Sequence, residues 1–199
     1  MADGTLKVGT ITTSSGSGTI TLGQSGETIA IPSGVTLTNS GTASGFGKVL
    51  QVLQSVKTDT FSSSSSSFTD ITGLSISITP SSTSNKILVM ANIVGGGILA
   101  TNIGHFRIVR DATAIYVGDA AGNRTQSFIG TMSPDLNGSI SSTAIYLDSP
   151  SSISSLTYKI QGLTTASTFY VNRSSNDTDD GTRPRTASSI LVMEISAWY

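Results

Sequence analysis

The feature that most constrains this chain is its N-terminal stretch, residues 1–47, which carries too little apolar surface to fold alone. Gly, Ser and Thr occupy 27 of these 47 positions, and the large aliphatic residues number nine. Four short pieces place two aliphatic side chains on one face of an extended strand; they are Leu6–Val8, Ile20–Leu22, Ile29–Ile31 and Val35–Leu37. Burying nine such side chains cannot offset the entropy lost on ordering this length of backbone. We expect the stretch to share its core with other copies, as a short-strand β shaft wrapped by three chains; a flexible linker is the alternative.

Residues 48–199 have the pattern of a separate globular domain made of β-strands. Segments rich in Val, Ile and Thr alternate apolar and polar side chains, and turn residues separate them at spacings of roughly 8 to 15 residues. The apolar run at 86–94 predicts a strand buried on both faces, and the serine run at 62–67 predicts a loop or an exposed edge. The pattern indicates an all-β fold, a β-sandwich or jelly roll. The expected strands are Lys48–Val56, Leu74–Ile78, Lys86–Val94, His105–Arg110, Ala114–Val117, Thr125–Met132, Ile140–Leu147, Leu156–Leu163, Thr168–Val171 and Ser189–Ser196.

Charge and residue usage argue against several classes of function. With 11 basic and 12 acidic residues the net charge is −1, so binding of nucleic acid through phosphate neutralisation is not expected. The chain has no Cys and one His, which excludes a thiolate nucleophile and a multi-histidine metal site within one chain. The longest apolar stretch, residues 87–100, is too short to span a bilayer. We therefore expect no nucleic-acid partner, no membrane insertion, no metal and no cofactor.

The polar stretch 172–185 is the first candidate for a binding site. Its acidic and basic residues either form salt bridges within or between subunits, or present a site for an anionic sugar. Oxygen-bearing residues at alternate positions before Gly181 are similar to a calcium loop, but the Glu that such a loop needs is replaced by Ala187. A solvated loop tip is the better interpretation. The candidate receptor contacts are Asn172, Arg173, Asp177, Asp179, Asp180, Arg183 and Arg185.

No catalytic constellation stands out elsewhere. A triad needs a nucleophile and an orienting acid beside His105, and Ser is too abundant for a match to be informative, so we expect a structural or surface histidine. Gly95–Gly97 lacks the Lys-Ser/Thr pair of a phosphate loop. Trp198 either caps the core or stacks on a sugar ring. Residues 119–124 form a second candidate loop for receptor contacts.

Several stretches of the chain carry a family resemblance. They are residues 3–11 and 29–43 in the N-terminal part, and 70–74, 78–80, 84–89, 169–174 and 185–190 in the later part. On these stretches the chain resembles the tail-fibre and related virion proteins of tailed bacteriophages, especially aquatic ones. The resemblance implies a homotrimer with a slender β shaft and a globular head, often a jelly roll like that of tumour necrosis factor. It implies no catalytic residue.

The resemblance and the residue pattern together predict a non-enzymatic virion fibre protein. Residues 1–47 would attach to other virion proteins and form the shaft, and residues 48–199 would present loops to the host surface, where a glycan is the expected receptor. The protein would be made in the host cytoplasm and reside on the particle surface. Two alternatives stay open: a capsid or tail decoration protein that stabilises the particle without binding the host, and a glycan depolymerase, which requires a cleft with two carboxylates.

Overall fold

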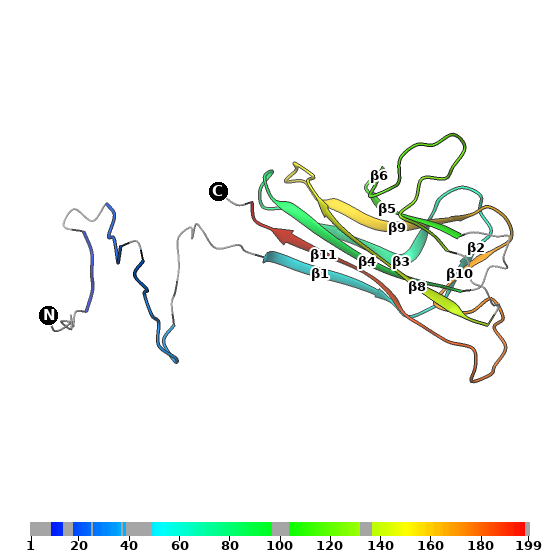
Figure 1. The fold of residues 1–199 in the computed structure, drawn as a ribbon, viewed down its shortest axis with the longest axis horizontal. Helices are drawn as coiled ribbons and strands as arrows, with labels where there is room; N and C mark the ends of the chain where they lie inside the picture. The colour runs from blue at the N-terminus through cyan, green and yellow to red at the C-terminus, as the bar shows by residue number, and fades with distance from the viewer. Residues whose placement is uncertain are drawn as a thin grey trace. The chain divides into compact units, whose positions relative to one another are not determined.

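The chain consists of two units, Met1–Ala43 and Ser44–Tyr199, which are described separately. The structure is a computed structural model. It describes residues 9–13, 18–24, 26–36, 38, 49–96, 104–131 and 137–197. Strands are the only regular secondary structure within these ranges, and they all lie in the second unit (Figure 1). The prediction of an all-β chain is therefore confirmed for the described residues.

The described part of the N-terminal unit consists of extended pieces joined by turns. The Val35 amide donates to the Pro32 carbonyl at 3.2 Å, and Gly34 between them has φ +84°, a left-handed conformation that glycine adopts without strain. The Glu27 amide likewise donates to the Gln24 carbonyl at 3.0 Å. The strands predicted at Ile20–Leu22 and Ile29–Ile31 do not form within one chain, because a strand needs a hydrogen-bonded neighbour. Residues 6–8, 37 and 39–41 lie outside the described ranges.

Every large aliphatic side chain described in this unit is exposed to solvent. The exposed fraction runs from 43% for Ile20 to 62% for Leu22. A single copy therefore provides no apolar core for these side chains, which is the situation that the sequence predicted. The others in the set are Ile11, Ile29, Ile31 and Val35.

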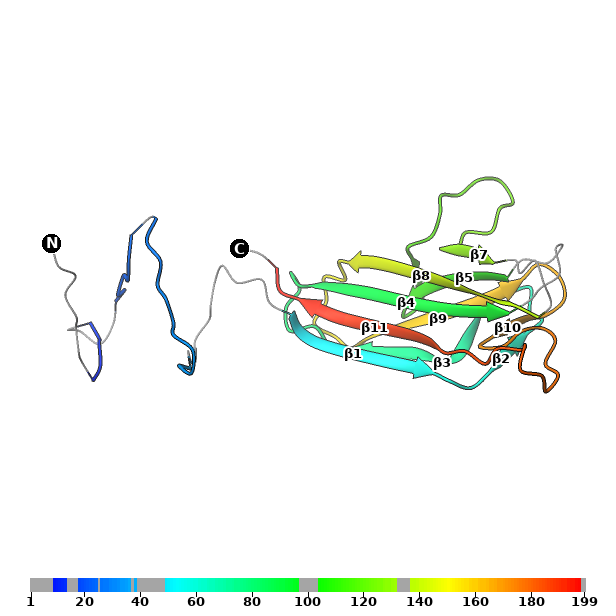
Figure 2. The same ribbon diagram turned by 60° about the horizontal axis from the view of Figure 1, so that its bottom comes forward.

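The second unit is a sandwich of two antiparallel sheets. Sheet A has six strands in the order β1-β11-β4-β10-β2, with β8 paired to β4, and sheet B has five in the order β3-β9-β5-β6, with β7 paired to β5. Figure 2 shows β1, β11, β4 and β8 side by side. The strands are β1 (Val49–Lys57), β2 (Phe61–Ser63), β3 (Thr69–Ile78), β4 (Lys86–Gly96), β5 (Gly104–Arg110), β6 (Thr113–Ile115), β7 (Ile129–Thr131), β8 (Ser139–Asp148), β9 (Leu156–Thr164), β10 (Phe169–Val171) and β11 (Ser188–Ile195).

The core lies between the inner faces of the two sheets. On sheet A, Ile190 and Val192 of β11 are fully buried, and on sheet B so are Tyr158 and Ile160 of β9. Alternate residues of each strand point inward because side chains alternate along a strand. The core also contains Ile71, Leu74, Ile87, Val89, Ile93, Phe106, Ile108, Phe169 and Val171.

β4 corrects one expectation about burial. Its residues Val89 and Ala91 are buried in the core, whereas Leu88 and Met90 on the opposite face are only partly covered. The continuous apolar pattern predicted burial on both faces, but in a single chain the second face of this strand lies open. For the serine run at 62–67, the sequence left a loop and an exposed edge as alternatives, and both occur. Ser62 and Ser63 lie in the edge strand β2, and the following serines form a loop.

A polar cluster crosses the core and joins the two sheets. Arg110 of β5 donates to both carboxylate oxygens of Asp148 at 2.7 and 2.6 Å, and the Tyr158 hydroxyl donates to the same carboxylate at 2.6 Å. Burial raises the pKa of Tyr158, and the hydrogen bond to Asp148 raises it further. The hydroxyl therefore stays protonated and keeps donating, which fixes β8 of sheet A against β5 and β9 of sheet B.

Candidate functional site

The candidate site is the polar loop 172–187, which connects β10 to β11. β10 pairs with β4 at Gly95 and Gly96, the last residues of β4. The first residue of β4, Lys86, pairs with Ile195, and Ile195 pairs with Val49 at the start of β1. The loop therefore emerges at the end of sheet A opposite to the end where the chain enters the domain (Figure 1).

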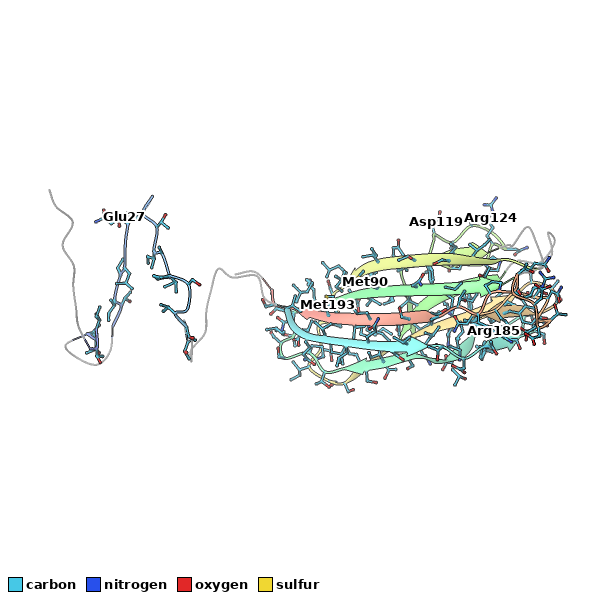
Figure 3. All side chains as sticks on the ribbon, turned by 90° about the horizontal axis from the view of Figure 1, so that it is seen from below. Glu27, Met90, Asp119, Arg124, Arg185 and Met193 are labelled. Atoms are coloured by element: carbon cyan, nitrogen blue, oxygen red, sulfur yellow. The ribbon has the colours of Figure 1, made fainter. Side chains whose placement is uncertain are left out.

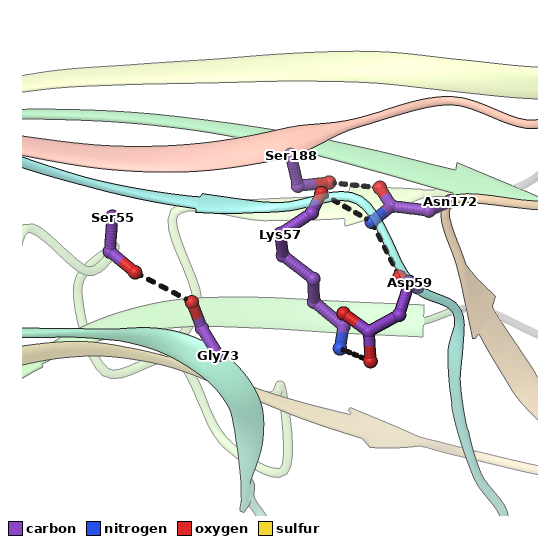
Figure 4. Close-up of polar contacts among 6 residues, drawn as sticks. All are labelled: Ser55, Lys57, Asp59, Gly73, Asn172 and Ser188. Carbon is purple, nitrogen blue, oxygen red and sulfur yellow. Dashed lines mark hydrogen bonds and ion pairs between the residues drawn. The ribbon is translucent and has the colours of Figure 1, made fainter.

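Asn172 fixes the start of this loop. Its side-chain amide donates to the carbonyls of Lys57 and Asp59 at 2.8 and 2.9 Å, and its side-chain oxygen accepts from the Ser188 hydroxyl at 2.6 Å (Figure 4). Its backbone amide donates to the Val94 carbonyl. The sequence predicted a receptor contact for Asn172. The residue is fully buried, so its side chain is not available for that contact. Its part is to position the loop.

A cluster of one carboxylate and two guanidinium groups occupies the loop surface. Asp177 forms ion pairs with Arg173 and with Arg185, the second at 2.8 Å. Arg173 also stacks over the ring of Tyr170, 4.2 Å from its centroid. Burial raises the pKa of Asp177 and the hydrogen bonds from the two arginines lower it by more, so it lies below its ordinary value of 3.8. The salt bridge expected between the acidic and basic residues of this stretch therefore forms within one chain.

The tip of the loop is a tight turn. Asp180 accepts hydrogen bonds from the backbone amide and the hydroxyl of Thr182, both at 2.8 Å, and these hydrogen bonds lower its pKa. The amide of Arg183 donates to the Asp180 carbonyl. Asp179 is exposed beside this turn. Within the described residues no group of three acidic or histidine side chains is placed to hold a metal ion.

The loop leaves one side chain strongly accessible to an incoming anion. The Arg185 side chain is 58% exposed, whereas that of Arg173 lies largely between Asp177 and Tyr170. Tyr170 belongs to β10 and was not among the predicted contacts. The only sequence feature that could have indicated this contact is an aromatic residue three positions before an arginine. That spacing is too common to predict a contact. The arrangement is chemically able to bind a carboxylate or a sulfate, with an aromatic ring alongside.

The other sequence candidates lie apart from this loop or outside the described residues. Residues 119–124 form a second exposed loop, which begins after β6; Figure 3 labels Asp119 and Arg124 on it. His105 lies on β5 with its ring nitrogen 3.4 Å from the Ser127 hydroxyl, and burial lowers its pKa. Gly95 lies in β4 and pairs with Val171 of β10. Gly97 and Trp198 lie outside the described ranges.

Comparisons with known proteins add no assignment to this geometry. No protein-family model matches the chain, and no curated protein matches it either. Among the described residues there is no helix of the length and apolarity needed to cross a membrane.

Proposed function

We propose that this chain is a structural virion protein of a tailed bacteriophage, a short homotrimeric fibre that attaches the particle to the host surface. Residues 1–47 bind other virion proteins and form the shaft with two further copies. The β-sandwich is the head, a jelly roll of the tumour-necrosis-factor type, and it presents loop 172–187 to an anionic glycan. The chain has no catalytic role in this function.

The observation that carries the proposal is the exposure of every described aliphatic side chain in the N-terminal unit. Six such side chains lie in extended pieces that form no strand pairing among the described residues of this unit. Identical copies satisfy both needs together, because neighbouring chains supply ladder partners and cover the apolar faces. The position of the polar loop supports the same function, since it lies at the end of the domain far from Val49.

Assembly is tested by sedimentation of the full chain beside a shortened chain that begins at Lys48. The full chain should sediment as a trimer at micromolar concentration, because its shaft residues are buried only between copies. The shortened chain keeps the whole core but loses the shaft, so its trimer should dissociate more readily on dilution. A full chain that remains a monomer at every concentration would contradict the proposed fibre.

Glycan recognition by loop 172–187 is tested with two substitutions of opposite expected sign. Arg185→Ala removes the exposed guanidinium and should weaken binding to an immobilised carboxylated polysaccharide by about 1.5- to 5-fold per site, the range of an exposed ion pair. Asp177→Ala removes the carboxylate that neutralises Arg173 and Arg185, so it should strengthen the same binding. Avidity in a trimer amplifies both effects. Biolayer interferometry measures them. Lys159→Ala on the outer face of sheet B, which removes one positive charge outside both candidate loops, is the matched control. If Arg185→Ala and Asp177→Ala both bound the polysaccharide as tightly as the wild type, loop 172–187 would be excluded as the contact.

A further inference from the structure

We propose that copies of this chain pack against one another through the outer face of sheet A. The inference rests on the proposed trimer and names the surface that assembles the heads. The apolar face consists of nine outward-facing residues on four neighbouring strands: Val49, Val52, Leu88, Met90, Ile145, Leu147, Leu191, Met193 and Ile195.

The register of the strands places these side chains in continuous rows across the sheet. Directly paired residues of antiparallel strands point to the same face, so the pairings identify each row. One row is Val52, Met193, Leu88 and Leu147, and the next is Gln54, Leu191, Met90 and Ile145. Figure 3 labels Met90 and Met193 on the neighbouring strands β4 and β11. The side chains at the two margins, Val52, Ile145 and Leu147, are each more than half exposed in a single chain.

The outer face of sheet B, in contrast, carries polar and charged side chains, so an apolar outer face is not a property of both sheets. There Asp70 accepts hydrogen bonds from Lys159 at 2.8 Å and from Gln161 at 2.6 Å. Gln161 in turn accepts from Arg107, whose guanidinium stacks on the ring of Phe68. A sheet face that remains in water is polar in this way. A contiguous apolar face on the other sheet marks a surface that a partner covers.

The apolar rows are also confined to one end of sheet A. The next outward-facing row consists of Val56, Ser189, Asn92 and Thr143, in which Val56 at the margin of the sheet is the one apolar residue. The Ser141 hydroxyl donates to the side chain of Asn92. A shallow hollow lined by Gln54, Met90, Asn92 and Leu191, among others, marks the border. The apolar end is the one where β1 begins at Val49 and β11 ends at Ile195.

This location favours a second copy of the chain as the occupant. β1 follows the N-terminal unit in the sequence, so chains joined through that unit hold their β1 strands near one another. Tethering of this kind gives effective concentrations of about a millimolar, which exceeds what a separate partner reaches in solution. The face is also suited to contact its own copy. On the outward-facing positions of β1, β4, β8 and β11 the one charged residue is Lys86, at the margin, so no charge is left buried without a counterion.

The test uses the absence of cysteine from the natural chain. Val52→Cys and Ile145→Cys, each made alone in the full chain, place a single thiol at either margin of the apolar face. Ser75→Cys, on the exposed outer face of sheet B, is the matched control. If copies cover the apolar face, alkylation of the first two thiols should be slower than that of the control by about tenfold or more, because thiol reactivity follows access. A short bifunctional maleimide should then join copies through position 52 or 145 and not through position 75.

The outcomes separate this inference from the proposed function. If the full chain sediments as a trimer while all three thiols react at the same rate, the face is not the interface and the trimer stands. If the full chain is a monomer, both proposals fail. Slow alkylation in a monomer, with no cross-linked copies, would show that another segment of the same chain covers the face, and this too would overturn the inference.

Discussion

Replacement of Glu194 by alanine should lower the free energy of unfolding of the C-terminal domain by about 3 to 5 kcal/mol. Four hydrogen bonds to a charged group, each worth about 1.5 to 3 kcal/mol, are lost, and part of this loss is offset because no carboxylate remains to be buried. Glu194 is fully buried near the end of β11. One carboxylate oxygen accepts from the Ser81 amide, the Ser81 hydroxyl and the Asn85 side chain, and the other accepts from Gln51, all at 2.6 to 2.8 Å. Alanine removes the acceptors, so the buried Asn85 amide loses its charged partner, and the less buried donors of Ser81 and Gln51 lose theirs as well.

The pH dependence of the unfolding free energy identifies the carboxylate as the source of this stability. Burial raises the pKa of Glu194, and the hydrogen bonds from Asn85, Ser81 and Gln51 lower it by more, so the folded value lies below the ordinary 4.5. The folded state therefore binds a proton more weakly than the unfolded state. The contribution of Glu194 is complete above about pH 4.5 and is lost as the pH falls through the folded pKa.

Glu194→Gln is the matched control for this prediction. A glutamine oxygen still accepts from Ser81 and Asn85, but its NH₂ group then faces the Gln51 amide, so we expect a loss of about 1 to 2 kcal/mol. Urea unfolding at pH 7 and at several values below pH 4.5 measures the difference between the wild type and this variant. The difference should shrink as the pH falls. A difference that is constant over this range would show that the carboxylate charge contributes nothing.

The sequence predicted most of the sandwich because alternation along each strand is a local property. β11, expected at Ser189–Ser196 and found at Ser188–Ile195, shows how closely such a pattern places a buried strand. The prediction is poorer where a strand is short and lies at an edge. The strand expected at 125–132 is limited to Ile129–Thr131, since its pairing partner β5 matches it over three residues.

What the sequence did not reveal depends on residues far apart in the chain. Glu194 is the one charged residue in the sequence of its strand, and nothing near it in the chain indicates its hydrogen-bond donors, which come from positions 51, 81 and 85. The apolar pattern of β4 predicted two buried faces, but periodicity cannot distinguish burial within one chain from burial between chains. At the candidate loop, charge suggested salt bridges between acidic and basic residues, within or between subunits, but not that Asp177 would pair with both Arg173 and Arg185. The role of Asn172 required knowledge of which carbonyls lie opposite its amide.

Asn172→Asp should be the second large loss, about 3 to 5 kcal/mol at neutral pH, because it places an unpaired negative charge in the interior. In the wild type, the amide nitrogen of Asn172 donates to the carbonyls of Lys57 and Asp59 (Figure 4). An ionised carboxylate has no proton to donate and would face these two oxygens. Burial and the nearby carbonyls raise the pKa of such a carboxyl group. The variant should therefore regain stability relative to the wild type as the pH falls, the opposite of the trend expected from Glu194.

Two further substitutions separate the side-chain hydrogen bonds of Asn172 from its backbone conformation. Asn172 has φ +63°, a left-handed conformation that asparagine tolerates and alanine does not. Asn172→Ala loses the hydrogen bonds and keeps this strain, whereas Asn172→Gly loses the same bonds and relieves it, so the glycine variant should be the more stable of the two by about 1 kcal/mol. Denaturant unfolding measures all three variants. If Asn172→Asp were as stable as the wild type at pH 7, the amide would not be what anchors loop 172–187, and the position of Arg185 would need another cause.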